Sequence, residues 1–388
     1  MEKEFNSICV VSQGYPTKVD PYFTFVEELC TAFSKQGKDV TVIAPQSFTS
    51  HFFKGAPAHP TIRIDEVEGG SPIHIYQPWM ITVPFRFLKI NDVLFTRAVK
   101  RAFEKLRYMP DVLYSHFWNN GLYISKAAKK HNLPLFVASG EGNFDVLENI
   151  YTQSKYLDFS KNVRGVICVS SHTRDCSIKL GLTTADKCIV LPNSIDSKKF
   201  YLRNKHELRK KYGYSDDAFI VAFVGSFINR KGSNRLSAAI ESLNDDNIKS
   251  FFIGMPQGPE NLIPTCKGVL KCGKVNHNDL PEYLSMADVF ALPTLNEGCC
   301  NAIIEALACG LPVISSNLPF NWDVLDSSNS IMINPNSIEE IASAIKKIKD
   351  DESLRVRLSE GAIKRASALT IENRAKSIIS FISIKLKN

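Results

Sequence analysis

The sequence lacks several features that would assign it to a common class. It has ten cysteines among 388 residues but no C-x-x-C pair, and most of them lie in apolar runs, as small buried hydrophobic residues do. No apolar run is long enough to span a bilayer, and the charged start MEKEFNS does not resemble a signal peptide. These absences predict a cytoplasmic protein with reduced cysteines.

Signatures of metal binding and of common nucleophiles are also missing. The chain has no D-x-D, no His/Asp/Glu cluster with metal-ligand spacing and no G-x-S-x-G elbow. The net charge of +7 is diffuse and forms no tract typical of nucleic-acid binding, so we expect no nucleic-acid partner. The charge suits an anionic small molecule or an anionic membrane surface. If the substrate carries a diphosphate, protein cations and a helix terminus must neutralise it.

What the sequence does contain is the same alternation of strands and helices twice. The first half opens with the apolar strand SICVVS at 7–12, and the second restarts with FIVAFVG at 219–225. Nearly continuous apolar strands that alternate with helices predict parallel sheets covered on both faces. We therefore expect an α/β protein with two doubly wound, Rossmann-like domains facing each other across a cleft. The expected parts are a first domain at 1–193, a hinge at 194–217, a second domain at 218–370 and a final helix at 371–388, for which packing back on the first domain is one arrangement.

Two carboxylates stand out in the stretch NEGCCNAIIEALACGLPV. Glu297 precedes an expected helix at 302–309, for which Asn301 is a plausible cap, and Glu305 lies inside that helix. A helix N-terminus suits a phosphate. Glu297 would then face whatever the phosphate carries, and Glu305 could accept hydrogen bonds from ribose hydroxyls. The alternative is a surface glutamate and a helix glutamate paired with a nearby Lys or Arg.

A second cationic stretch follows the first strand of the second half, in VAFVGSFINRKGSNRL. The strand ends at Gly225, Ser226 begins the loop, and Arg230 and Lys231 precede the next helix. Two cations at the end of a strand could neutralise a diphosphate. The alternative is a solvated turn, in which Arg and Lys are common.

The first half offers fewer candidates, again at the carboxyl ends of strands, where ligands of such sheets bind. Gly14 and Tyr15 follow the first strand, and His116 ends the strand DVLYSH. Glu141 lies in the glycine-rich loop VASGEGN. His116 could equally be a structural residue, and Glu141 could cap the next helix.

Taken together, these stretches resemble glycosyltransferase family 4, a group of retaining sugar transferases with the GT-B fold. The family carries E-G-[FY]-G-x-x-x-x-E-A-x-A-x-G-x-P-V, which reads EGCCNAIIEALACGLPV here. LPEYLSMADVFALPTLNEG, CVSSHTRDCSIKLG, IVLPNSIDSKKF and DVLYSH resemble four further family motifs in the same order. The resemblance covers nearly the whole chain.

The resemblance implies a hexosyl- or glycosyltransferase that builds a cell-surface polysaccharide or glycolipid. Its donor would be a UDP- or GDP-linked sugar in the second domain, and its acceptor a glycan or lipid-linked glycan in the first. Glu305 would hold the ribose, Glu297 the sugar and Lys231 the diphosphate, with Arg230 and His116 completing the catalytic set. The same comparison places Gly225, Ser226, Gly298, Cys299, Cys300 and Asn301 at the donor, and Gly14, Tyr15, His116 and Glu141 at the acceptor. No metal and no cofactor besides the donor is implied.

This sequence departs from the family pattern at several of these positions. Cys299 and Cys300 replace an aromatic residue and a glycine, Ser226 stands where many members have arginine, and Glu141 where many have histidine. Ser194 replaces the hinge glycine. Two alternatives therefore stay open: a nucleotide-sugar epimerase, and a non-catalytic subunit that binds a nucleotide sugar.

The stretch from Trp79 to Arg107 interleaves aromatic and basic residues. Its cations are Arg86, Lys89, Arg97, Lys100, Arg101, Lys105 and Arg107. It could lie on an anionic membrane and receive a lipid-linked acceptor, which would make the protein peripheral on the inner face of the membrane. The alternative is a core helix with a solvated basic face.

Overall fold

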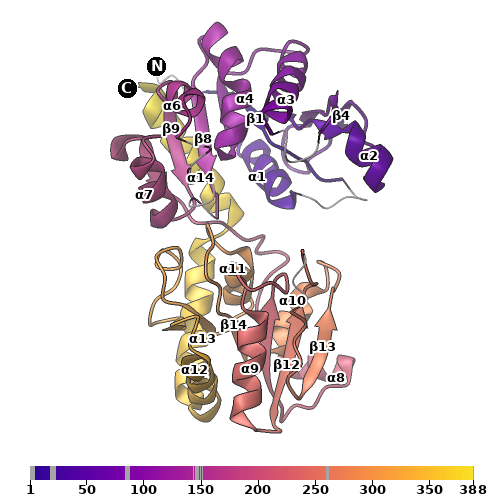
Figure 1. Cartoon of the computed structure of the whole chain (residues 1–388), viewed down its shortest axis with the longest axis vertical. Coiled ribbons are helices and arrows are strands. Elements are labelled where there is room, and N and C mark those ends of the chain that lie inside the picture. The colour runs from indigo at the N-terminus through magenta and orange to yellow at the C-terminus, as the bar shows by residue number, and fades with distance from the viewer. Residues whose placement is uncertain are drawn as a thin grey trace. The chain divides into compact units, whose positions relative to one another are not determined.

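The structure is a computed structural model that describes residues 5–17, 23–83, 88–142, 144, 148, 150, 152–258 and 262–387. The chain divides into two units, each with its own sheet (Figure 1). The first comprises Met1–Val169, Thr173–Leu191 and Ile371–Asn388, and the second Ser170–His172 and Pro192–Thr370.

The first unit contains an eight-stranded sheet in the order β10-β9-β8-β7-β1-β2-β5-β4. All neighbouring strands are parallel except β4, which is antiparallel to β5. The strands are β1 (Ser7–Val11), β2 (Asp39–Ile43), β4 (Ile62–Asp65), β5 (Ile73–Tyr76), β7 (Val112–His116), β8 (Leu135–Ser139), β9 (Val163–Cys168) and β10 (Cys188–Val190). A small separate pair joins β3 (Gln46–Ser47) to β6 (Trp79–Met80).

Helices cover both faces of this sheet because successive strand residues point to opposite sides. Ile8 and Val10 belong to a core shared with α1 (Thr24–Lys35) and α14 (Ile371–Lys387). Cys9 and Val11 belong to a core shared with α3 (Leu88–Phe103) and α4 (Phe117–Lys130). The remaining helices of the region are α2 (Phe48–Lys54), α6 (Ser154–Ser160), α7 (Ser171–Lys179) and the short η2 (Ala185–Lys187).

The last helix of the chain, α14, packs against α1 and β9 within the first unit (Figure 1). Gly165 of β9 permits this packing, because a Cβ atom there would lie 2.7 Å from the ring of Phe381. The helix at Ile371–Lys387 therefore covers part of one face of the first unit's sheet.

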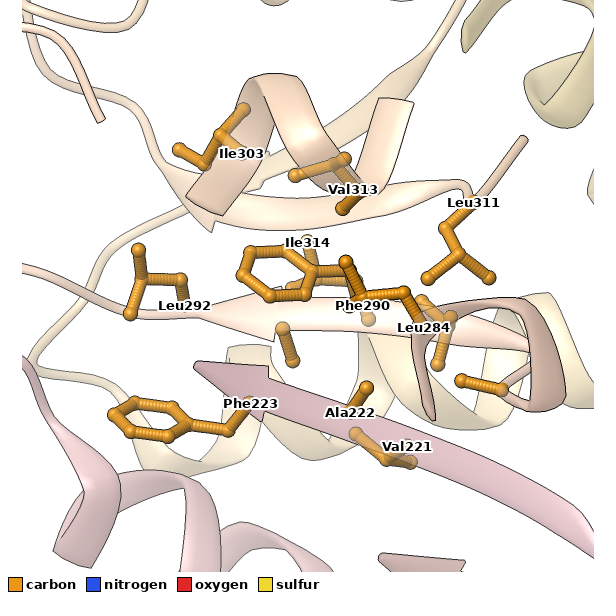
Figure 2. Close-up of a cluster of buried hydrophobic side chains, with 14 of the residues drawn as sticks. Val221, Ala222, Phe223, Leu284, Phe290, Leu292, Ile303, Leu311, Val313 and Ile314 are labelled. Atoms are coloured by element: carbon orange, nitrogen blue, oxygen red, sulfur yellow. The ribbon is translucent and has the colours of Figure 1, made fainter. Parts of the chain in front are cut away.

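The second unit contains a six-stranded, fully parallel sheet in the order β13-β12-β11-β14-β15-β16. Its strands are β11 (Phe219–Val224), β12 (Ile248–Ile253), β13 (Val269–Gly273), β14 (Val289–Leu292), β15 (Val313–Ser316) and β16 (Ser330–Ile333). Its helices are α8 (Lys205–Tyr212), α9 (Ser233–Leu243), α10 (Leu280–Met286), α11 (Asn301–Ala308), α12 (Ile338–Asp350) and α13 (Glu352–Ala368). Figure 2 shows how Ile303 of α11 and Leu284 of α10 pack with the central strands around Phe290.

The stretch expected as a hinge, 194–217, contains helix α8 and belongs to the second unit. A buried arginine attaches it there. Arg209 donates to the backbone oxygens of Met286 and Ala218 and forms a 2.7 Å ion pair with Asp288. Asp288 also accepts the N–H of Ile220 on β11, so α8 is tied directly to the start of the second sheet.

Helix α3, in the basic stretch from Trp79 to Arg107, has two distinct faces. Ala98, Val99, Ala102 and Phe103 are buried, whereas Ile90, Val93, Arg97, Lys100 and Arg101 are exposed. The helix is therefore a core element with a solvated face that is largely basic. Arg86 and the side chain of Lys89 lie outside the described residues.

Among the described residues, no helix combines the length and the apolar character needed to cross a bilayer.

Candidate active site

Two glycines shape the loop after β11, because a side chain at either position would collide with neighbouring backbone atoms. Gly232, which precedes α9, has φ +79°, and a Cβ there would lie 2.5 Å from the backbone oxygen of Pro293. Gly254 follows β12, where a Cβ would lie 1.9 Å from the backbone oxygen of Gly225. These approaches hold the β11–α9 loop against the ends of β12 and β14 and direct its cations toward the next loop.

Three donors converge on one carboxylate oxygen of Glu297, which lies in the loop after β14. Lys231 Nζ lies 2.6 Å and Arg230 Nη1 3.0 Å from Oε1, and the Thr294 hydroxyl donates to the same atom at 2.8 Å. Glu297 is buried. The loop itself is fixed to its neighbour, because Leu295 N–H donates to the Arg230 backbone oxygen at 2.8 Å. The structure thus places two cations and one acid in a single bonded cluster at the carboxyl ends of adjacent strands.

The Lys231 ammonium stays charged although it is mostly buried. Burial by itself would lower its pKa, but the negative charges that the neighbouring Cys300 and Glu297 side chains carry when they are ionised more than offset that effect, so the pKa lies above its usual value. Burial raises the pKa of the Cys300 thiol, which is therefore neutral at pH 7. A fixed positive charge in a poorly solvated setting can bind a phosphate strongly.

Helix α11 begins one residue earlier than the sequence indicated. Its N-cap is Cys300, whose side chain makes no capping bond, so the expectation of Asn301 as cap is wrong. Asn301 instead accepts a 2.7 Å hydrogen bond from the side chain of Asn193, which also donates to the Cys299 backbone oxygen at 3.0 Å. The start of α11 therefore has no side-chain cap, and the Ile303 N–H donates to the Cys300 backbone oxygen at 3.2 Å.

Glu305 lies on α11, mostly buried, and its ion-pair partner among the described residues is a histidine rather than the Lys or Arg considered above. His277 Nε2 lies 3.7 Å from Glu305 Oε1, and His277 Nδ1 lies 2.5 Å from Lys199 Nζ. Because an ammonium group only donates, Nδ1 is the acceptor and Nε2 carries the proton that faces Glu305. The gap of 3.7 Å exceeds a hydrogen bond, so the carboxylate keeps capacity for further donors such as ribose hydroxyls.

The remaining donor-side residues surround this cluster. The Ser226 hydroxyl donates to Gln257 Oε1 at 2.9 Å, and Gly298 is buried in the loop before α11. A Cβ on Gly225 would meet the Lys231 side chain at an ordinary 3.5 Å, which places these two positions in contact. Gly225 thus lies beside the bonded group of Arg230, Lys231 and Glu297.

In the first unit, His116 ends β7 and is almost completely buried. Its ring packs edge-on against Tyr114 and Phe25, with centroids 5.2 and 5.6 Å apart, and its Nε2 has no hydrogen-bond partner among the described residues. Burial, followed by the charge of Arg374, lowers its pKa to about 3. The imidazole is therefore neutral at pH 7, and its Nε2 is a buried nitrogen without a hydrogen-bond partner among the described residues.

Glu141 has a clear structural role. One of its carboxylate oxygens accepts the backbone N–H of Trp118 at 2.9 Å, and the other accepts the Ser139 hydroxyl at 2.9 Å. Trp118 lies in the first turn of α4, so Glu141 caps the start of that helix, which precedes it in sequence.

Gly14 and Tyr15 lie beyond β1 in the same unit. The Gly14 N–H donates to the Ser12 hydroxyl at 3.4 Å. Tyr15 is buried, its hydroxyl lacks a hydrogen-bond partner among the described residues, and the Arg63 guanidinium lies 5.5 Å from its ring.

A hollow in the first unit lies away from all these residues. It is lined by Phe5, Asp111, Pro134, Asn162 and Lys187, which precede β1, β7, β8, β9 and β10. It therefore opens at the amino ends of the strands, opposite to the candidate residues. Within the described residues, no group of three or more His, Cys, Asp or Glu side chains could hold a metal ion.

Two residues of the site escaped the sequence analysis. Thr294 supplies the third donor to Glu297, and Asn193 connects the start of the second unit to α11. Thr294 lies three residues before Glu297, and Asn193 lies in the quoted stretch IVLPNSIDSKKF. The signal that could have identified both residues is their position next to or within stretches already singled out in the sequence.

Comparison with known proteins agrees with this geometry. A family model described as "Glycosyltransferase Family 4" matches residues 23–199, and one described as "Glycosyl transferases group 1" matches residues 204–365. TuaC of Bacillus subtilis (strain 168), named as a glycosyltransferase of teichuronic acid biosynthesis, is 27% identical over 359 residues, covering 88% of this chain and 89% of TuaC. An Escherichia coli UDP-Gal:alpha-D-GlcNAc-diphosphoundecaprenol alpha-1,3-galactosyltransferase is 25% identical, covering 74% of this chain and 79% of that protein.

Solved structures show the same fold. Sucrose-phosphate synthase from Thermosynechococcus elongatus matches with a TM-score of 0.78 at 19% identity, covering 98% of this chain and 99% of that chain. Anabaena Alr3699/HepE in complex with UDP and glucose matches with a TM-score of 0.71 at 17% identity, covering 97% and 99%. The two α/β units and these structural matches confirm the expected fold class, the GT-B fold. The chain belongs to glycosyltransferase family 4.

Proposed function

We propose that this protein transfers a hexosyl group, with retention of anomeric configuration, from a nucleotide-diphosphate sugar to a hydroxyl of a glycan or lipid-linked acceptor. The observation that carries the proposal is the cluster of Lys231, Arg230 and Glu297 at the strand ends of the second unit. Two cations held beside one acid suit a ligand that joins a diphosphate to a polyhydroxylated ring.

In this proposal, the second unit binds the donor and stabilises the leaving group. Lys231 and Arg230 share their positive charge with the diphosphate as its negative charge develops, and the N-terminus of α11 adds its backbone N–H groups. Glu297, already held by Thr294, accepts hydrogen bonds from sugar hydroxyls. Glu305 accepts hydrogen bonds from the ribose. These protein groups supply the charge neutralisation, so the proposed reaction needs no metal.

The acceptor would be bound by the first unit. Neutral His116, whose buried Nε2 has no hydrogen-bond partner among the described residues, would hydrogen-bond a hydroxyl group there without adding a charge. In a retaining transfer, the acceptor hydroxyl attacks from the face on which the phosphate departs, and the departing phosphate can accept the hydroxyl proton. Glu141 is occupied with capping α4, so its role in the proposal is to position Trp118 and the start of that helix.

The relatives support a particular donor and acceptor class. The E. coli relative is named for a UDP-linked sugar and a diphosphoundecaprenol acceptor, and HepE has been solved with UDP and glucose. TuaC and the Staphylococcus aureus protein CapM are named for the synthesis of surface polysaccharides. We therefore propose a UDP-sugar donor and a lipid-linked glycan acceptor, used by a cytoplasmic protein in peripheral contact with the membrane.

Calorimetry with UDP, GDP and ADP sugars, followed by transfer assays without added metal, tests this function. We expect tight binding of one nucleotide class, and NMR of the product should show the anomeric configuration of the donor. Turnover should be lost in Lys231→Ala and Glu297→Ala. Transfer that survives both substitutions unchanged would refute the proposal. Nucleotide binding without turnover would favour a non-catalytic subunit, and conversion of the free donor into its epimer would favour an epimerase.

A further inference from the structure

The first unit carries an exposed aromatic surface that no part of the proposed catalytic site uses. It is formed by α2, β6 and the residue after β6, and its residues are Phe48, Phe52, Phe53, Trp79 and Ile81. Phe52 is 67% and Phe53 82% exposed. Phe48 contacts both Phe52 and Trp79, with ring centroids 4.7 and 6.0 Å apart, so these rings form one cluster rather than scattered side chains.

The backbone beneath this aromatic surface is held by polar contacts. Ser47 caps α2 by accepting the Ser50 N–H at 3.0 Å, and its hydroxyl lies 2.6 Å from that of Thr82. The Thr82 N–H donates to Thr49 at 3.1 Å, which joins α2 to the residues after β6. The rings are therefore presented to solvent by a fixed element. Clustered exposed aromatic side chains on a fixed element are unusual in soluble proteins unless they meet another surface.

Hydrogen bonds to the backbone join the residues after β6, beside the aromatic surface, to the start of α3. Asn91 exchanges two hydrogen bonds with the backbone of Val83, and α3 packs on β6. Along that face, exposed Ile90 and Val93 come first, and Arg97, Lys100 and Arg101 follow one to three turns later. An apolar region is thus bordered by a cluster of cations, one of which, Lys100, has an exposed and weak 3.7 Å pair with Glu104.

We propose that the aromatic surface and the basic face of α3 together dock on an anionic lipid bilayer. The phenylalanines would enter the boundary between headgroups and acyl chains, and the α3 cations would contact anionic headgroups. Trp79, half-buried at the base of the cluster, suits the interfacial level, where amphipathic rings are favoured.

The cations favour a bilayer over a second copy of this chain. Two copies that met through this surface in a symmetric dimer would bring their basic α3 faces close together, which is unfavourable. A bilayer containing anionic lipid supplies both an apolar phase and negative charge. This proposal does not depend on the donor site, so vesicle binding tests it independently of catalysis.

Sedimentation with vesicles of equal parts phosphatidylglycerol and phosphatidylcholine tests the proposal. The apolar contribution is tested by the double variant Phe52→Ser/Phe53→Ser, with Val356→Ser/Ile384→Ser, two exposed apolar residues on α13 and α14, as the matched control. The charge contribution is tested by Lys100→Glu/Arg101→Glu, with Lys267→Glu/Lys364→Glu, two exposed lysines of the second unit, as its control.

We expect the wild-type protein to bind the mixed vesicles and to bind pure phosphatidylcholine weakly. The aromatic double variant should bind at least about tenfold more weakly because its apolar insertion is lost. Charge reversal should weaken binding by at least about fivefold per residue and reduce its salt dependence. Both control variants should bind like wild type. All the substituted side chains are exposed, so the variants should keep the wild-type circular dichroism spectrum.

Unchanged vesicle binding in either test variant would overturn the proposal. It would also be overturned if the protein ignored vesicles and formed a dimer in light scattering that Phe52→Ser/Phe53→Ser dissociated. That result would assign the aromatic surface to self-association instead.

Discussion

Replacing Lys231 by methionine should separate catalysis from folding. Methionine keeps much of the length and the apolar stem of lysine but removes the charge. Glu297 would not be left alone, because Arg230 at 3.0 Å and Thr294 at 2.8 Å still donate to its Oε1. The neighbouring loops also keep their backbone contact from Leu295 to Arg230. We therefore expect the free energy of unfolding to fall by only about 1 kcal/mol.

The effect on transfer should be much larger. An ammonium group about 4 Å from a phosphoryl charge, at an effective dielectric constant near 20, contributes roughly 4 kcal/mol. Lys231 is mostly buried and its pKa is raised, so this charge is present at neutral pH. If most of that energy is realised as the diphosphate departs, kcat/KM should fall about 10³-fold, in line with the loss of one preorganised donor.

The assay is the initial rate of transfer from the preferred UDP sugar, with thermal unfolding measured on the same preparations. Lys364→Met, an exposed lysine of the same unit, is the control and should behave like wild type. A decrease of less than about threefold in Lys231→Met, with an intact fold, would refute the view that this ammonium neutralises the leaving diphosphate.

Three further predictions concern backbone fit, protonation and nucleotide recognition. Gly232→Ala should lower the free energy of unfolding, measured by denaturant titration, by about 3 kcal/mol, because its Cβ would lie 2.5 Å from the Pro293 backbone oxygen. The control Gly213→Ala, which has φ +74° but no atom within 4 Å of the added Cβ, should lower it by about 1 kcal/mol. The pKa of His116 is lowered from 6.5 to about 3, so below pH 6.5 the unfolded chain binds a proton that the folded chain does not. The free energy of unfolding should therefore fall as pH drops from 6.5 toward 3, by at most about 1.4 kcal/mol per pH unit. In His116→Gln, urea titrations at several pH values should show that the free energy of unfolding depends less steeply on pH, by the contribution of one proton. His277→Ala should let the Glu305 carboxylate reorient. Calorimetry should then show about fivefold weaker UDP binding and less discrimination between UDP and 2′-deoxy-UDP. Unaltered discrimination would contradict the orientation assigned to His277.

The order of elements was accessible from the sequence because it follows from local periodicity. Apolar runs such as FIVAFVG and SICVVS became buried parallel strands β11 and β1. Residues that follow such strands collect at one edge of a sheet, whatever the details of packing. Arg230, Lys231 and Glu297 could therefore be expected to lie near one another before any coordinates were considered.

The partners of individual side chains were not accessible in this way. Glu141 caps α4 from a loop 23 positions away in sequence, and Arg209 is joined to Asp288 across 79 positions. A Lys or Arg partner for Glu305 was one alternative that the sequence left open, whereas its ion-pair partner among the described residues is His277. Such pairs depend on which loops the sheet order brings together, and no local pattern encodes that order.

By itself, the sequence determined that two sheets of mostly parallel strands form and which residues lie at their strand ends, because hydrophobic periodicity is a local property. Tertiary structure alone decided that Lys231, Arg230 and Thr294 share one oxygen of Glu297, that α11 begins at an uncapped terminus, and that phenylalanines of α2 face solvent. Those outcomes depend on distances between segments far apart in the chain, which are set when the whole set of strands and helices packs together.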